Sequence, residues 1–175
     1  MTNASPVRVL IADDHLLFAE SLGLTLDIDD RLEHVGTARN GKEAVRMVEE
    51  LRPNVVLMDL DMPVMDGIEA TRQLRRSFPD CQVVVLTASL AVEDAHRARS
   101  AGAAAYLTKG CMMRDVIDAL LEVVLSSHPR KEENGLRARI AGASGGGASA
   151  APLAIARVFN TLSVEAVFTH QVAQP

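Results

Sequence analysis

Carboxylate side chains follow two apolar runs of this sequence, and their positions suit metal-dependent phosphoryl chemistry. Asp59 comes directly after the run Val55 to Met58, whose length and β-branching are typical of a strand buried on both faces. Asp13 and Asp14 follow the earlier run Val9 to Ile11. Ligands of open parallel α/β sheets bind at the carboxyl ends of the strands. If the two runs form neighbouring strands, the three carboxylates meet at that edge.

The residue types at this edge indicate a cation and a reaction. Carboxylate oxygens are ligands for a hard divalent cation, and Mg²⁺ is the ion that we expect. A carboxylate such as that of Asp59 needs no base before it accepts a phosphoryl group. An ordinary acidic loop is the alternative for a single acid after a strand. Thr87 and Lys109 also end apolar runs, and the combination favours the phosphoryl site.

The same residues carry a family resemblance. Asp13-Asp14, Asp59 with the following segment Met62 to Gly67, Thr87-Ala88, and Tyr106 to Lys109 together resemble the receiver domain of bacterial two-component response regulators. The opening Ala-Asp-Asp-His and Lys109-Gly110 are more similar to the subgroup that carries a LuxR-type DNA-binding helix-turn-helix. The resemblance spans roughly residues 7 to 126.

The resemblance implies a role for each of these residues. Asp59 would accept the phosphoryl group from a phosphohistidine of a sensor histidine kinase. Thr87 and Lys109 would bind that group, and Tyr106 would turn inward and remodel the face formed by the fourth helix, fifth strand and fifth helix. The implied Mg²⁺ ligands are Asp13, Asp14, Asp59 and the backbone carbonyl of Asp61.

The elements that must position these residues alternate between strands and helices. Strands are expected at residues 7–11, 32–37, 55–58, 82–86 and 103–107, and helices at 15–26, 42–51, 68–77, 92–100 and 113–126. The alternation predicts an α/β fold, a doubly wound (βα)5 unit with a five-stranded parallel sheet in the order 2-1-3-4-5. That order places the ends of the first and third strands side by side.

Three helices carry more specific expectations. In the first, the leucines at positions 16, 17, 22 and 24 are expected to share the buried face, and for His15 a solvent-facing or capping role is favoured over a metal role. The fourth offers mainly alanines to the core, so weak anchoring is expected. In the last, an apolar stripe at helical spacing is interpreted as core: Met113, Val116, Ile117, Leu120, Leu121 and Val124.

Composition narrows the class of protein. Hydrophobic residues make up 48% of the chain and aromatic residues only 3%, which predicts an aliphatic core. No apolar stretch approaches 18 residues and no leader pattern opens the chain, so we expect a cytoplasmic protein without membrane contact. Residues 1–127 hold 13 Lys and Arg against 20 Asp and Glu, a net of −7, which argues against nucleic acid binding by this part. Cys81 and Cys111 are expected to be reduced packing residues.

The chain is expected to divide into one folded domain and two further segments. Residues 1–127 are interpreted as the receiver domain, residues 128–151 as a flexible linker rich in Gly, Ala and Ser, and residues 152–175 as a short helical tail. The tail is similar to the later half of a LuxR-type helix-turn-helix, degenerate or truncated, because the Gly-Ala-Ser run takes the place of its first helix. Its candidate DNA contacts are Ser163, Thr169 and His170.

Three functions remain open at this point. The first is a response regulator switch, with no enzymatic activity beyond Mg²⁺-dependent self-phosphorylation and autodephosphorylation, that acts through protein contacts. The second is a DNA-binding transcriptional regulator, expected to be a homodimer. The third is a phosphotransferase similar to haloacid dehalogenases, because Asp59-Leu60-Asp61 matches their Asp-x-Asp motif, although that motif normally follows the first strand.

Overall fold

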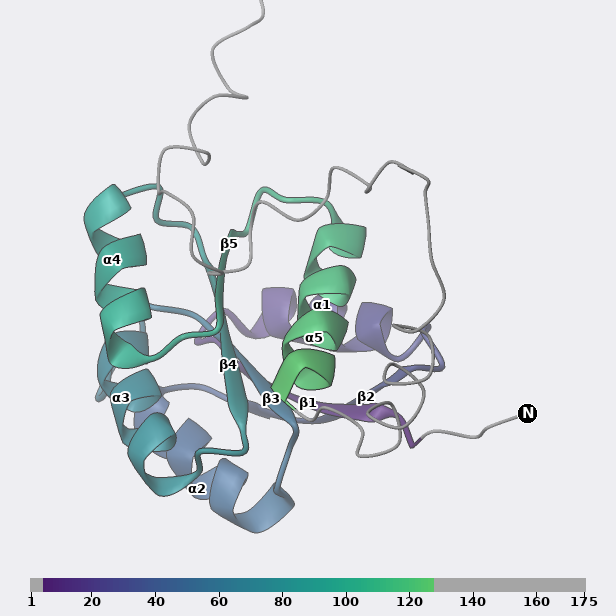
Figure 1. The fold of residues 1–175 in the computed structure, drawn as a ribbon. Helices are drawn as coiled ribbons and strands as arrows, with labels where there is room; N and C mark the ends of the chain where they lie inside the picture. Colours follow the sequence, from purple (N-terminus) through teal and green to yellow (C-terminus); the bar gives the residue numbers. More distant parts are fainter. Residues whose placement is uncertain (1–4, 128–175) are drawn as a thin grey trace, which may run out of the picture.

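A computed structural model describes residues 5–127, which form one five-stranded parallel sheet with helices on both faces (Figure 1). The strand order is β2-β1-β3-β4-β5, as predicted. The strands are β1 (Val7–Ala12), β2 (Leu32–Ala38), β3 (Val55–Met58), β4 (Gln82–Thr87) and β5 (Ala105–Thr108). The helices are α1 (Leu16–Leu26), α2 (Gly41–Leu51), α3 (Gly67–Ser77), α4 (Val92–Ala101) and α5 (Met113–Ser127).

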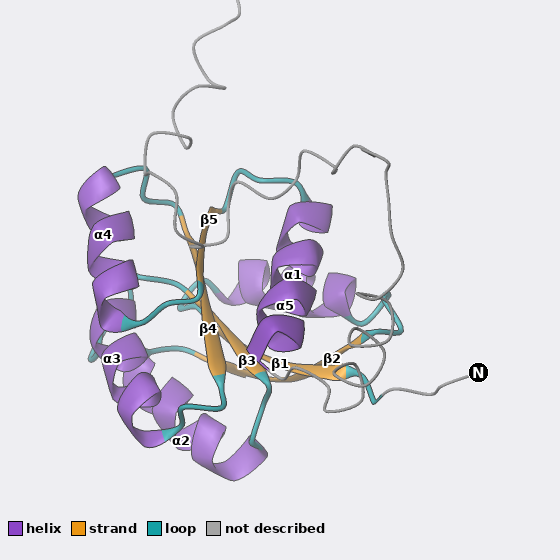
Figure 2. Ribbon diagram, viewed as in Figure 1, coloured by secondary structure: helices purple, strands orange, loops and turns teal. Residues whose placement is uncertain are grey.

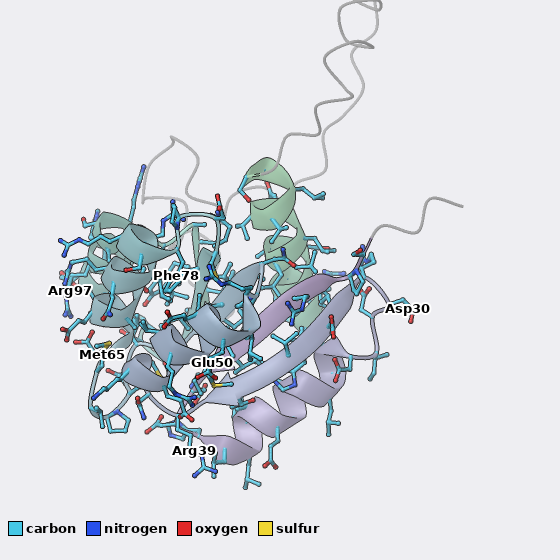
Figure 3. All side chains as sticks on the ribbon, turned by 90° about the horizontal axis from the view of Figure 1, so that it is seen from below. Asp30, Arg39, Glu50, Met65, Phe78 and Arg97 are labelled. Carbon is cyan, nitrogen blue, oxygen red and sulfur yellow. The ribbon has the colours of Figure 1, made fainter. Side chains whose placement is uncertain are left out.

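Two helical layers cover the sheet (Figure 2). Side chains alternate between the faces of a strand, so Val9 and Ile11 of β1 pack with α1 and α5, whereas Leu10 packs with α2 and α3. In Figure 3, Glu50 of α2 and Arg97 of α4 lie well away from Asp30, which follows α1. Because β3 is buried on both faces, its carboxyl end is held from two sides.

Side-chain caps fix the starts of two helices near that edge. Asn40 accepts a hydrogen bond from the backbone N–H of Glu43 at 2.9 Å, and Asp66 accepts one from Glu69 at 2.7 Å. Such caps satisfy backbone donors that a helix leaves unpaired at its first turn. Asp66 thereby anchors α3 directly after the loop that leaves Asp59.

The apolar face expected for α1 is wrong in part. Leu17 and Leu24 are 84% and 72% exposed, and Leu16 is also exposed. The buried face consists of Ala19, Leu22, Gly23 and Leu26. Gly23 faces the ring of His34 in β2 so closely that an added Cβ would lie 2.6 Å from its Nδ1. The helix therefore packs through two leucines, Leu22 and Leu26, together with two small residues, and only Leu22 belongs to the predicted face.

The other expectations on the elements hold with small shifts. β5 begins at Ala105, two residues later than expected, although the backbone N–H of Ala104 already donates to Val83 at 2.8 Å. The apolar stripe of α5 packs into the core, as predicted. Across residues 5–127, none of the helices combines the length and hydrophobicity that crossing a bilayer demands.

Candidate functional site

Three site residues directly follow three strands. Asp13, Asp59 and Lys109 are the first residues after β1, β3 and β5. The backbone N–H of each donates to a carbonyl of the adjacent strand, at 2.9, 2.8 and 2.8 Å respectively. The hydrogen-bond ladder therefore continues one residue beyond each strand and fixes where these side chains begin.

The Lys109 ammonium bridges two buried carboxylates. Its Nζ lies 2.7 Å from Asp13 Oδ2 and 2.8 Å from Asp59 Oδ2. The carboxylate side chains are 3% and 4% exposed, and that of Lys109 is 17% exposed. Burial alone would lower the pKa of the ammonium, but its hydrogen bonds to the two carboxylates outweigh burial, and the pKa of Lys109 is raised. The Lys109 ammonium therefore remains protonated and holds a positive charge beside Asp59.

An aromatic ring supports the same ammonium. Lys109 Nζ lies 4.8 Å from the centroid of the Phe18 ring in α1, within the range of a cation–π interaction. No sequence pattern links residues 18 and 109, so sequence reasoning missed this contact. The two residues meet because the Lys109 side chain extends from the end of β5 to Asp59 and Asp13, which follow β3 and β1, and α1 begins shortly after Asp13.

The three carboxylates expected to meet do so. Ligand atoms of Asp13, Asp14, His15 and Asp59 all lie within 4.8 Å of one another. Asp13 and Asp59 are buried whereas Asp14 is exposed, so the group opens to solvent on the Asp14 side. Oxygen donors gathered at such a mouth fit a hard divalent cation such as Mg²⁺.

The loop between β3 and α3 closes tightly on Asp59. The Gly67 N–H donates to the Leu60 carbonyl at 3.0 Å, and the Leu60 N–H donates to Asp59 Oδ1 at 2.8 Å. An added Cβ at Gly67 would collide with the backbone carbonyl of Asp59. Within this loop Val64 has a φ of 70°, in the left-handed region that disfavours β-branched residues. This conformation also went unpredicted.

Thr87 and Tyr106 join through the loop that follows β4. Thr87 is fully buried at the end of β4, and its Oγ1 accepts from the Ser89 N–H at 3.3 Å. The Tyr106 hydroxyl donates to the Ser89 carbonyl at 3.1 Å, and Ser89 Oγ donates to Asp94 of α4 at 2.6 Å. Burial, the largest influence, raises the pKa of Tyr106. The alternative role of Thr87 as the cap of α4 is wrong, because α4 begins after Ala91 without a side-chain cap.

Some predicted site residues are placed only in part. Asp61 lies in the β3–α3 loop with an exposed side chain, and the role of its backbone carbonyl as a metal ligand remains a prediction. Ser163, Thr169 and His170 lie outside the described residues, as do the linker and the tail. The loop residue Ser89, which sequence reasoning did not single out, connects two of the predicted switch residues.

Comparisons with known proteins agree with this architecture. The response regulator receiver domain model matches residues 9–121. Response regulator GacA of Pseudomonas aeruginosa is 40% identical over 117 residues, which cover 67% of this chain and 55% of GacA. Response regulator protein VraR of Staphylococcus aureus is 36% identical over 114 residues, 65% of this chain and 54% of VraR. The chain thus spans about half the length of these curated relatives.

Solved structures match the same part of the chain. A LuxR-family two-component response regulator from an Aurantimonas species has a TM-score of 0.67 at 26% identity, covering 78% of this chain and 99% of that one. A CheY-like receiver domain protein from Methanospirillum hungatei has a TM-score of 0.65 at 25% identity, covering 71% of this chain and 98% of that one. Since the receiver model also spans well over half of the residues, the chain belongs to the response regulator receiver domain family of two-component systems.

Proposed function

We propose that this chain is a phosphorylation switch in which Asp59 accepts a phosphoryl group from a phosphohistidine of a sensor histidine kinase. The observation that carries the proposal is the Lys109 ammonium held between Asp13 and Asp59 at 2.7 and 2.8 Å. A cation so placed offsets the charge that a phosphoryl group brings to Asp59. The family typically provides a signalling switch rather than an enzyme, in keeping with this role.

In the phosphoryl transfer, Asp59 is the only group of the protein that forms a covalent bond. An Asp59 carboxylate oxygen attacks phosphorus, a P–O bond forms, and the P–N bond to the donor imidazole breaks with its electron pair returning to that nitrogen. Positioning and charge stabilisation supply the rate enhancement in such reactions. Lys109 would move from shared contact with Asp13 and Asp59 toward the new phosphoryl oxygens.

A divalent cation fits the oxygen donors of Asp13, Asp14 and Asp59, with the Asp61 carbonyl as the fourth proposed ligand. When bound, Mg²⁺ would neutralise charge on the phosphoryl oxygens. The residues of this chain would hold the cation, exclude bulk water on the buried side, and orient the Asp59 carboxylate. The exposed Asp14 side is the route by which the cation and the donor enter.

The change at Asp59 would reach the surface through the β4–α4 loop. If the Thr87 hydroxyl turns toward a phosphoryl oxygen, its contact with the Ser89 N–H is lost. Ser89 also forms hydrogen bonds with Tyr106 of β5 and Asp94 of α4. A displacement of Ser89 would therefore shift both β5 and α4. The surface around Tyr106 is therefore the proposed output face.

Phosphoryl acceptance can be tested by intact-mass spectrometry of the full chain after exposure to acetyl phosphate with and without Mg²⁺. We expect one added phosphoryl group, dependent on Mg²⁺ and absent in Asp59→Asn. Asp80→Asn is the matched control, because Asp80 is an exposed carboxylate in the turn before β4. Equal phosphorylation of Asp59→Asn would overturn the assignment of the acceptor.

Transcriptional control is the output that the relatives favour, since the Aurantimonas match is of the LuxR family. In this form of the proposal the cytoplasmic chain would dimerise on phosphorylation and bind DNA through residues beyond 127. A DNA library screened with the full chain at defined salt, with and without beryllofluoride and Mg²⁺, tests it. Specific binding that beryllofluoride strengthens supports transcription, whereas a beryllofluoride response without DNA binding supports a switch that acts on a protein partner.

The phosphotransferase alternative has no comparable support. Asp59-Leu60-Asp61 follows β3 and not the first strand, which is where the haloacid dehalogenase motif normally lies. The Asp61 side chain is exposed, whereas a general acid/base would face the phosphoryl site. Multiple turnover of a phosphate ester by the chain would revive this alternative.

A further inference from the structure

His15 brings an imidazole nitrogen to the mouth of the acidic pocket. Its Nδ1 lies 3.0 Å from Asp14 Oδ1 and 3.3 Å from Asp13 Oδ1. The side chain is 69% exposed, so burial does not force the ring toward the carboxylates. The ring thus lies on the open side of the pocket, where a cation would enter.

The backbone of His15 is fixed while its ring remains available. The His15 N–H donates to Asp13 Oδ1 at 2.9 Å, and its carbonyl accepts from Ala19 in the first turn of α1 at 3.0 Å. His15 is the N-cap of α1, yet its side chain makes no capping hydrogen bond. Of the two roles expected from the sequence, the solvent-facing one is confirmed by the exposure of the ring, and the capping one is wrong. Neither role accounts for the contact of Nδ1 with two carboxylates.

The spacing of these donors suits adjacent ligands of one ion. At a bond length of about 2.1 Å, two neighbouring ligands of an octahedral ion lie about 3 Å apart. The distances from Nδ1 to the two carboxylate oxygens, 3.0 and 3.3 Å, are close to that separation. With small rotations of the exposed His15 and Asp14 side chains, the imidazole nitrogen and two oxygens could therefore contact one ion, while the buried Asp13 carboxylate stays in place.

Lys109 does not contact the carboxylate oxygens that lie nearest to His15. Its ammonium contacts Oδ2 of Asp13 and Oδ2 of Asp59. The Oδ1 atoms of Asp13 and Asp14 instead lie toward His15. The pocket therefore has a cationic half at Lys109 and a mixed nitrogen and oxygen half at His15.

We propose that His15 is a direct metal ligand, so that the pocket prefers first-row transition ions such as Mn²⁺, Co²⁺ and Ni²⁺ to Mg²⁺. The proposal rests on the metal site of the proposed function and adds the identity of its ion. Mg²⁺ takes oxygen ligands almost exclusively, whereas an imidazole adds affinity that rises from Mn²⁺ through Co²⁺ to Ni²⁺.

Calorimetric titration of the full chain with each ion at one pH tests this preference. His15→Asn should weaken Co²⁺ and Ni²⁺ binding by about tenfold or more, Mn²⁺ binding by less, and Mg²⁺ binding by less than about twofold. His96→Asn, which removes an exposed histidine of α4, is the matched control and should leave all four affinities unchanged. Ions bound by other histidines would bind the wild type and His15→Asn equally. They therefore do not contribute to the difference in affinity between the two proteins.

A spectroscopic signature identifies the ligand directly. Electron spin-echo measurements on the Mn²⁺-loaded chain should show coupling to an imidazole nitrogen that disappears in His15→Asn and persists in His96→Asn. Circular dichroism of each variant establishes that it is folded. A loss of affinity without that nitrogen coupling would mean that His15 only positions Asp13 and Asp14, which overturns the proposal.

The outcomes separate this inference from the proposed function. Equal binding of every ion by the wild type and His15→Asn, through Asp13, Asp14 and Asp59, overturns the role of His15 and leaves the phosphoacceptor site intact. No divalent ion bound by the wild type overturns both the metal site and this inference. Phosphorylation of Asp59 by acetyl phosphate is measured independently of either result.

Discussion

At the scale of single residues, Lys109 shows how charge and burial combine in the pocket. The carboxylate side chains of Asp13 and Asp59 are 3% and 4% exposed, and the Lys109 ammonium contacts both. We predict that Lys109→Met lowers the free energy of unfolding by about 2 kcal/mol, because two buried carboxylates lose their partner. Urea denaturation measures this change. Lys42→Met, which removes an exposed lysine of α2, should change stability by less than about 0.5 kcal/mol.

The pH dependence of that difference has a definite sign. The pKa of Lys109 is raised above its ordinary value of 10.5. Its contribution is therefore fully present below pH 10.5 and is lost as the pH rises through the higher pKa of the folded state. The stability gap between wild type and Lys109→Met should stay constant from pH 7 to 10 and close only above that. A gap that closes below pH 10 would contradict the raised pKa.

Val64 stores strain in the loop beside the phosphoacceptor. It has a φ of 70° and is 81% exposed, so no packing compensates for its left-handed backbone. We predict that Val64→Asn and Val64→Gly raise stability by about 0.5–1 kcal/mol, the gain for Gly being offset in part by its greater freedom when unfolded. Thermal unfolding measures the change. Val64→Ile keeps the β-branched strain and should not stabilise; if it does, strain is not the cause.

The site residues that could be predicted from the sequence are those that directly follow a strand. Asp13, Asp59 and Lys109 could be assigned to one pocket because each ends a recognisable apolar run and parallel strands align their carboxyl ends. The Phe18 contact with Lys109 could not, because it depends on the rotation of α1 about its axis. The left-handed backbone of Val64 could not be predicted either, because valine disfavours that conformation.

At the scale of elements, the start of α3 depends on a residue without a side chain. A Cβ at Gly67 would collide with the Asp59 carbonyl and lie 2.9 Å from the Cα of Leu60. Both neighbours are backbone, so neither can swing aside. We predict that Gly67→Ala costs about 3 kcal/mol or displaces α3 and the acceptor with it. Guanidinium denaturation measures the cost.

Gly110 supplies the matched control for that prediction. No atom lies within 4 Å of where its Cβ would be, and its φ is not in the left-handed region. Gly110→Ala should therefore be neutral or stabilise the chain by up to about 1 kcal/mol. If both substitutions cost the same, the close approach of Gly67 to Asp59 does not limit the loop.

Helix α4 is held to the sheet by little apolar surface. Its buried residues are Ala98 and Ala101, whereas α5 buries Val116, Leu120 and Val123. We predict that amides of α4 exchange with deuterium faster than those of α5, because small contacts leave local opening inexpensive. Hydrogen exchange with mass spectrometry compares the two helices in one experiment. Beryllofluoride with Mg²⁺ should change protection in α4 more than in α2; equal protection of α4 and α5 would contradict the weak anchoring.

The elements themselves were largely predictable, and the error in α1 has a physical origin. Periodicity and β-branching located every described strand to within about two residues. In α1 the leucines occur on all sides, so the sequence offers several candidate faces. The face that packs is the one whose Gly23 admits the His34 ring, and this fit between α1 and β2 exists only in three dimensions.

At the scale of the whole molecule, the described residues close their own core. The larger apolar clusters, one on each face of the sheet, draw their buried side chains from β1 through α5, the last being Val123. Both faces of β3 are covered by helices within residues 5–127. Burial on this scale predicts that the receiver unit folds independently of residues 128–175.

Truncation tests that independence. A chain ending at Ser127 should unfold cooperatively, with a free energy of unfolding within about 0.5 kcal/mol of the full chain, since no buried side chain of the described core is removed. A chain ending at Asp118 removes the buried residues Ala119, Leu120 and Val123, and should lose about 4 kcal/mol or more. Both are compared with the full chain by urea denaturation. A large loss on truncation at Ser127 would mean that residues 128–175 complete the core, and the boundary of the receiver domain would then lie beyond α5.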